Sequence, residues 1–206
     1  MDDLSIISWL DSLAERTPAP GGGAAAAVNA AMSAALIGMV ASYTTGKKWA
    51  DRETRMRELN QEAEQLRKEA LRLAEEDQHA FAKVGAAYGM PRETDEQKSD
   101  RREAIQSALI GAAEPPVAIA VLSRRLVELA GELVDGGNPN VVSDVAVAAS
   151  NAHAALQAAV VNIEINAASI KDEDVVRGLR STVEGCTATF AAAEDVVRRV
   201  RAVISA

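Results

Sequence analysis

The stretch that decides the fold is residues 21–45, GGGAAAAVNAAMSAALIGMVASYTT, in which alanine and glycine dominate. Alanine is the best intrinsic helix former, and the run is followed by Gly46, a residue that commonly ends a helix. We therefore expect one long helix of small residues that ends at about Thr45. Because small side chains let neighbouring helices approach closely, we also expect this helix to be central, with tight packing as the main role of its alanines.

The composition extends this preference to the whole chain of 206 residues. About 40 residues are alanine, 48% are hydrophobic and only 3% are aromatic. Strands favour the β-branched and aromatic residues that are scarce or scattered here, so an all-β or disordered chain is disfavoured. We predict an all-α fold, a single-domain bundle over residues 1–206 with an Ala-rich core.

Glycine, proline and capping residues divide the chain into about six long helices. Thr94 is a plausible N-cap with Gln97 in capping-box position. The pair Pro115–Pro116 is expected to kink or break the helix that contains it. The expected helices cover about residues 5–16, 24–45, 51–88, 94–134, 143–170 and 172–203.

Charge and cysteine content limit the partners. The formal net charge is −8 and the pI is about 4.9, whereas phosphate binding needs a basic field. We expect no nucleic-acid partner and no membrane association, although a local basic pocket for a small anion is compatible with this balance. The single cysteine, Cys186, excludes an internal disulfide framework. The most apolar stretch, Gly21–Val40, is too weakly hydrophobic to argue for membrane insertion, so we expect a cytoplasmic protein.

Histidine chemistry is disfavoured because the only histidines, His79 and His153, have no partner at metal-ligand spacing. Acid–base chemistry would then fall to a carboxylate. Asp77, in EEDQHAFAKV (75–84), is one candidate because an apolar face passes close to it at Phe81. On spacing alone, a solvated acidic run is the simpler interpretation of these residues.

Two further patterns have a functional and a structural interpretation. The glycines at 21–23 open a helix whose free N–H groups could face an anion, or they form a tight turn before a packed helix. On the helix from Ser143, four polar side chains fall within about 60° of one another at 100° per residue: Asp144, Asn151, Asn162 and Asn166. They could line a polar cleft or form hydrogen bonds between helices.

Six segments follow one order and spacing that resembles the cyclodeaminase/cyclohydrolase family. They are TPAPGGGAAAA (17–27), MVASYTTGKKW (39–49), EEDQHAFAKV (75–84), MPRETDEQKSDRREAIQSAL (90–109), GNPNVVSD (137–144) and VNIEIN (161–166). This family comprises the cyclodeaminase domain of formiminotransferase-cyclodeaminase and stand-alone methenyltetrahydrofolate cyclohydrolases. The resemblance extends from about Ser12 to Asn166 and more weakly beyond.

The resemblance implies an all-α bundle, usually a homodimer, with one-carbon folate chemistry. One branch converts 5-formiminotetrahydrofolate to 5,10-methenyltetrahydrofolate with loss of ammonia. The other hydrolyses the methenyl compound to 10-formyltetrahydrofolate. We take the cyclodeaminase as the main prediction and the cyclohydrolase as the alternative. A non-catalytic helical scaffold or binding protein is a further alternative, which the retained motifs disfavour.

The resemblance also assigns site residues. Asp77 falls on the position of the proton donor and acceptor. The positions that would bind substrate fall on Gly21, Gly22, Gly23, Lys47, Arg92, Arg101, Asn138, Ser143, Asp144, Asn162 and Asn166. The family implies a small-molecule folate partner, no metal, and no cofactor beyond the tetrahydrofolate derivative that serves as substrate.

Overall fold

The computed structural model describes residues 5–206, so the first four residues of the predicted domain 1–206 lie outside the described range. Within this range the chain forms seven α-helices and two short 3-10 helices, with no strand. The prediction of an all-α, single-domain bundle is confirmed. The elements are α1 (Ile6–Ala14), α2 (Gly22–Tyr43), η1 (Lys47–Trp49), α3 (Glu53–Tyr88), α4 (Asp95–Gly136), η2 (Pro139–Val141), α5 (Val142–Ala167), α6 (Glu173–Gly185) and α7 (Thr187–Ser205).

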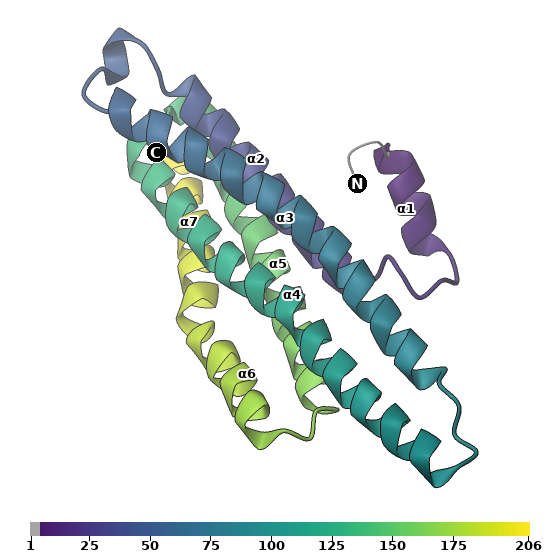
Figure 1. Ribbon diagram of the computed structural model, residues 1–206. Coiled ribbons are helices and arrows are strands. Elements are labelled where there is room, and N and C mark those ends of the chain that lie inside the picture. The colour runs from purple at the N-terminus through teal and green to yellow at the C-terminus, as the bar shows by residue number, and fades with distance from the viewer. Residues whose placement is uncertain (1–4) are drawn as a thin grey trace.

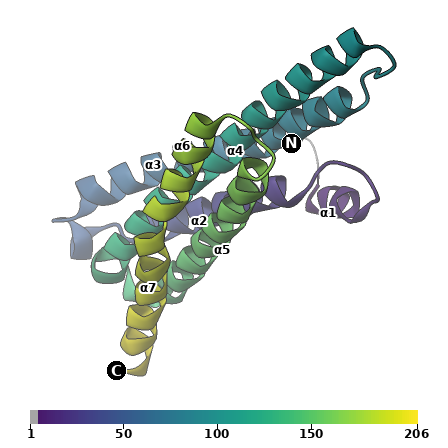
Figure 2. The same cartoon turned by 90° about the horizontal axis from the view of Figure 1, so that it is seen from below.

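The helices form two layers with additions at each side. Figure 1 shows α3 and α4, the two longest helices, lying antiparallel in front of α2 and α5. Helices α6 and α7 lie on one side of this arrangement and α1 on the other (Figures 1 and 2). The connected ends of α3 and α4 project beyond the other helices as a hairpin (Figure 2). The capping box predicted at Thr94 begins α4, with Gln97 as its partner.

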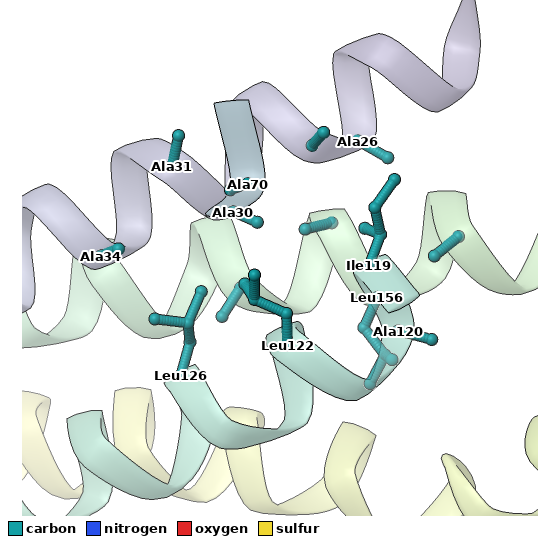
Figure 3. Close-up of a cluster of buried hydrophobic side chains, with 14 of the residues drawn as sticks. Ala26, Ala30, Ala31, Ala34, Ala70, Ile119, Ala120, Leu122, Leu126 and Leu156 are labelled. Carbon is teal, nitrogen blue, oxygen red and sulfur yellow. The ribbon is translucent and has the colours of Figure 1, made fainter. Parts of the chain in front are cut away.

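The core is built around α2, as its small side chains predict. Ala26, Ala30 and Ala34 of α2 are at most 1% exposed, and larger side chains of α4 and α5, such as Leu126 and Leu156, fill the space around them (Figure 3). By length and composition alone, α2 and part of α4 could also cross a membrane. Since both helices contribute many buried residues to the same core, helix packing accounts for their apolar character.

The structure differs from the expected helices at two places, a break at the proline pair and a single helix at the C-terminal end. Helix α4 continues without a break through Pro115 and Pro116, both of which are buried. Proline inside a helix costs about 3 kcal/mol, a penalty that burial of this long helix against its neighbours offsets. The single helix expected over 172–203 is two helices, which meet at the buried Cys186. Gly185 weakens the helix at that point, and the change of direction lets α7 pack along α4 and α5.

Candidate functional site

A cavity of about 200 Å³ lies where α2 begins, between the middle of α3, the middle of α4 and the end of α5. The α1–α2 connection covers one side of it. The cavity is therefore made by four segments that are far apart in the sequence. Its lining residues are Pro18, Ala19, Gly21, Gly22, Gly23, Asp77, Phe81, Ala112, Asn162, Ile165 and Asn166.

The carboxylate of Asp77 lies directly against the first turn of α2. A Cβ atom added to Gly23 would be 2.1 Å from Oδ1 and 2.4 Å from Cγ of Asp77, far inside contact distance. An added Cβ at Gly22 would meet only Asn162 Nδ2, at 3.8 Å, and one at Gly21 would meet nothing within 4 Å. Of the three glycines, Gly23 is thus the one that the close approach of Asp77 requires.

Burial raises the pKa of Asp77 above its usual value, because the charged carboxylate is partly withdrawn from water. The backbone N–H of Ala24, at the start of α2, donates to this carboxylate and partly opposes the rise. The positive end of the α2 dipole acts in the same sense. Asp77 is therefore held in place by α2 while its proton affinity is increased, and perturbed carboxylates of this kind are common at sites that transfer protons.

Two amide side chains of α5 face the same cavity. Asn162 Nδ2 donates to Ala158 O at 2.7 Å, and Asn166 Nδ2 donates to Asn162 O at 2.9 Å and to Ala112 O at 3.2 Å. The two Oδ1 atoms accept no hydrogen bond from any residue in the described range. The pair therefore offers the cavity two acceptors, which suit a ligand with N–H donors along one edge.

Sequence reasoning did not assign the apolar part of this cavity to the site. Phe81 and Ile165 line it and remain 49% and 65% exposed. Phe81 follows Asp77 by four residues and Ile165 follows Asn162 by three, so each shares a helix face with a predicted site residue. This spacing could have predicted from the sequence that Phe81 and Ile165 belong to the site. Pro18 and Ala19 stand just before the predicted glycines in the motif TPAPGGG, so their position in the sequence was a signal as well. Ala112 had no comparable signal, because only the packing of the chain brings it to the cavity.

Four predicted site residues lie at the opposite end of α2: Lys47, Asn138, Ser143 and Asp144. Helix α2 has 22 residues, so at about 1.5 Å per residue its two ends are about 30 Å apart. The backbone and the side chain of Asn138 form hydrogen bonds within the protein. Its N–H donates to Thr44 Oγ1 at 2.9 Å, its Nδ2 donates to Tyr43 O at 2.8 Å, and its Oδ1 accepts from Asn140 N at 3.0 Å. These bonds tie the end of α2 to the α4–α5 connection.

The two predicted arginines lie towards the tip of the α3–α4 hairpin, outside the cavity lining. The guanidinium of Arg101 donates to Tyr88 O at 3.0 Å and lies 5.7 Å from the centre of the Tyr88 ring. Tyr88 is 11 residues beyond Asp77, or about 16 Å along α3. Arg92 is exposed in the connection between α3 and α4. Of the predicted site residues, only the three glycines, Asp77, Asn162 and Asn166 therefore lie together at the cavity of one chain.

Comparison with known proteins places this arrangement in a family. The family model described as formiminotransferase-cyclodeaminase matches residues 5–185. The chain belongs to the formiminotransferase-cyclodeaminase family. The sequence resemblance is thereby confirmed, and membership of this family makes the chain a one-carbon folate enzyme of the cyclodeaminase/cyclohydrolase type.

Members of the formiminotransferase-cyclodeaminase family differ in length and in named activity. A methenyltetrahydrofolate cyclohydrolase from Methylorubrum extorquens is 37% identical, over 93% of this chain and 92% of the relative. A formimidoyltransferase-cyclodeaminase from Rattus norvegicus is 31% identical over 83% of this chain, which spans only 32% of that longer protein. The crystal structure of a formiminotetrahydrofolate cyclodeaminase from Thermotoga maritima, 33% identical, superposes with a TM-score of 0.84 and covers 99% of this chain and 97% of its own.

Proposed function

We infer that the protein hydrolyses 5,10-methenyltetrahydrofolate to 10-formyltetrahydrofolate, with Asp77 as the proton acceptor and donor. The observation that carries this function is the partly buried Asp77, fixed over the start of α2 beside two free amide acceptors. The choice of this reaction is supported by the similarity of the chain to the methenyltetrahydrofolate cyclohydrolase of Methylorubrum extorquens, which extends over nearly the whole length of both proteins.

The proposed chemistry needs one group that can take up and return a proton. Water adds to the methenyl carbon, which lies between N5 and N10, and Asp77 removes a proton from that water. The bond from this carbon to N5 then breaks, Asp77 returns its proton to N5, and the proton of the remaining hydroxyl passes to solvent as the C=O bond of the formyl group on N10 forms. The substrate's methenyl cation is delocalised over the two nitrogens, so a nearby carboxylate also stabilises it electrostatically. General acid–base catalysis of this kind contributes about 10²–10⁴-fold.

The amides of Asn162 and Asn166 would orient the pterin. Their free Oδ1 atoms can accept from the N–H groups along the pterin edge. Phe81 and Ile165 would pack against the apolar parts of the substrate. We propose Arg92 and Arg101 as partners for the carboxylates of the glutamate tail, which the net charge of −8 would otherwise repel. Lys47 of the same chain, about 30 Å away at the other end of α2, does not reach this site.

The cyclodeaminase reaction is the second candidate, and the similarity to the Thermotoga maritima cyclodeaminase favours it. In this reaction N10 attacks the formimino carbon on N5, and the terminal nitrogen leaves as ammonia. Asp77 would take the proton from N10 and return it to the departing nitrogen. The same carboxylate position therefore serves both reactions.

We also propose that the protein is cytoplasmic and homodimeric, and that neither reaction draws on a metal or redox cofactor.

The first test follows the absorbance of 5,10-methenyltetrahydrofolate with purified protein. We expect loss of the methenyl chromophore faster than the uncatalysed rate, and a loss of about 10²–10⁴-fold in this rate for Asp77→Asn. Formation of the chromophore from 5-formiminotetrahydrofolate without its hydrolysis would instead support the cyclodeaminase. Inactivity in both assays would overturn the enzyme proposal, and full activity of Asp77→Asn would overturn the role of Asp77.

A further inference from the structure

The cavity at the start of α2 contains a negative charge without a neighbouring positive side chain. Among the residues that the structure describes, its lining includes the carboxyl group of Asp77 and no basic group. The basic residues that follow Asp77 on α3, His79 and Lys83, line a different cavity, formed by α3 and α4. Arg101 is held at Tyr88, about 16 Å from Asp77 along α3. The reacting end of a substrate therefore meets a carboxylate that no described cation of this chain neutralises.

The start of α2 is closed to an anionic ligand, because Asp77 already occupies it. The backbone N–H of Ala24 donates to the Asp77 carboxylate, and the positive end of the helix dipole acts on the same group. A Cβ added to Gly23 would be 2.1 Å from Asp77 Oδ1, so the carboxylate lies directly on the first turn. The anion at these N–H groups is thus a side chain of the protein, and it repels a negative group of a ligand.

The uncharged groups of the lining are also electron-rich. The Oδ1 atoms of Asn162 and Asn166 accept no hydrogen bond from the described residues, so they face the cavity as acceptors. Phe81 is 49% exposed, which leaves about half of its surface open to a ligand. The face of an aromatic ring carries negative partial charge and attracts a cation. Carboxylate, amide oxygens and aromatic ring therefore all favour a positive ligand over a neutral one.

Helical geometry places Phe81 beside the carboxylate. Phe81 follows Asp77 by four residues, so their Cβ atoms are about 5–6 Å apart on one face of α3. Side chains in a helix lean towards its N-terminus, so the ring of Phe81 leans over the turn that carries Asp77. Both residues line the same cavity. A flat cation that contacts the carboxylate is therefore close enough for the ring, which attracts a cation within about 6 Å of its centre.

We propose that this site selects a cationic one-carbon group, and that Phe81 is a specificity-determining residue that acts through the face of its ring. The proposal rests on the proposed function and applies to both reactions considered for it. The methenyl bridge is an amidinium cation, and the formimino group is an amidine that is protonated near neutral pH. The 5-formyl and 10-formyl groups have a similar size and no charge. Beyond its apolar contact, Phe81 therefore distinguishes folates of similar shape by their charge.

This preference acts on binding more than on the chemical step. Hydrolysis turns the amidinium into a neutral formyl group, so the attraction to Phe81 is lost as the reaction proceeds. An interaction that is stronger in the bound substrate than in the transition state lowers KM without raising kcat. Phe81→Leu should therefore raise KM for 5,10-methenyltetrahydrofolate by about fivefold without a fall in kcat. The neutral 10-formyl product should inhibit the wild-type protein weakly.

Binding of two matched probes tests the selectivity without turnover. The probes are 5-formimino-6-methyltetrahydropterin and 5-formyl-6-methyltetrahydropterin, which differ only in the NH₂⁺ or O that ends the one-carbon group. Both lack N10, so neither can be cyclised. We expect the wild-type protein to bind the cationic probe about tenfold more tightly in NMR titrations at neutral pH, because a charge-assisted hydrogen bond to Asp77 adds to the attraction of the ring.

Three variants separate the effect of charge from that of packing. Phe81→Leu keeps an apolar side chain without a π face, and it should reduce the preference for the cationic probe about fivefold while the affinity for the neutral probe stays within about twofold. Phe81→Tyr keeps the aromatic face and should retain the wild-type preference. Tyr88→Leu is the matched control, because Tyr88 is an exposed aromatic residue of the same helix outside the cavity lining, and neither affinity should change.

Three results would overturn the proposal. Equal affinity of the wild-type protein for the two probes, or no binding of the cationic probe, would refute the selectivity. An equal loss of both affinities in Phe81→Leu would show that the side chain serves only packing, and loss of the preference in Phe81→Tyr would exclude the ring face as its cause. If the wild-type protein is inactive in both folate assays, the proposed function fails, whereas the two probes still decide whether the cavity selects a cation.

Discussion

Replacement of Gly23 by alanine tests the close approach between α2 and Asp77. The new Cβ would lie 2.1 Å from Asp77 Oδ1, whereas real Cβ atoms are almost never closer than 3.0 Å to another heavy atom. The carboxylate must therefore move by at least 0.9 Å, the difference between these two distances. A misplacement of about 1 Å can cost about 10²-fold in rate, so we expect kcat/KM to fall by about two orders of magnitude.

The fold should tolerate this change. Alanine is better than glycine inside a helix by about 0.5–1 kcal/mol, and the atoms that must move are the far end of a flexible side chain, Asp77. We therefore expect the free energy of unfolding of Gly23→Ala to stay within about 1 kcal/mol of wild type. Loss of activity with a nearly unchanged stability would locate the effect at the Asp77 carboxylate.

The assay is the steady-state hydrolysis of 5,10-methenyltetrahydrofolate, with urea unfolding of the same samples. Gly178→Ala in α6 is the matched control, because a Cβ there meets nothing within 4 Å, and its activity should be unchanged. In the Asp77→Asn background, Gly23→Ala should cost little further activity, since both changes act on one group. Wild-type kcat/KM for Gly23→Ala would refute the reasoning.

Three further outcomes follow from the contacts of individual side chains. Folding raises the pKa of Asp77, so its stabilising contribution is complete below the ordinary carboxyl pKa of 3.8 and is lost as pH rises through the raised value. Asp77→Asn should therefore gain stability relative to wild type as pH rises above 3.8, and a difference in melting temperature that stays constant with pH would contradict this cause. Asn166→Ala removes a free acceptor from the cavity and a hydrogen bond to Ala112 O, and we expect KM for the folate to rise about tenfold, measured by initial rates. Asn138→Ala leaves the carbonyl of Tyr43 unpaired, which should lower the free energy of unfolding by about 1–3 kcal/mol in urea titrations. Its KM should stay near that of wild type, and a large rise in KM without a loss of stability would restore Asn138 to the substrate site.

Local rules predicted most helix positions and failed where tertiary packing overrode them. Thr94 and Gln97 form the capping box that their spacing indicates, because a capping box involves only neighbouring residues. Pro115 and Pro116 carry an equally local signal, yet α4 passes through them because its buried face compensates for the proline penalty. The break at Cys186 was missed for the opposite reason: the local pattern continues, and the packing of α7 on α4 and α5 requires a change of direction.

The candidate site shows the same division. Periodicity placed Asp144 and Asn162 on one side of α5. It gives only the direction in which a side chain leaves the helix, and not its position along the helix axis. Their 18-residue separation is about 27 Å along the helix, so only one of them reaches the cavity. The resemblance to the family selected Asp77 from an acidic run that spacing alone left ambiguous.

The sequence by itself determined the all-α class, the small-residue helix at the centre and the family, because each depends on composition or on the order of motifs. Only the tertiary structure decided that Gly23 and Asp77 are in contact and that Lys47, Ser143 and Asp144 lie at the far end of α2 from them. These facts depend on how closely α2 and α3 approach and on how long the helices are. Contacts between residues more than fifty positions apart are set by packing across the bundle, and no local pattern in either helix encodes them.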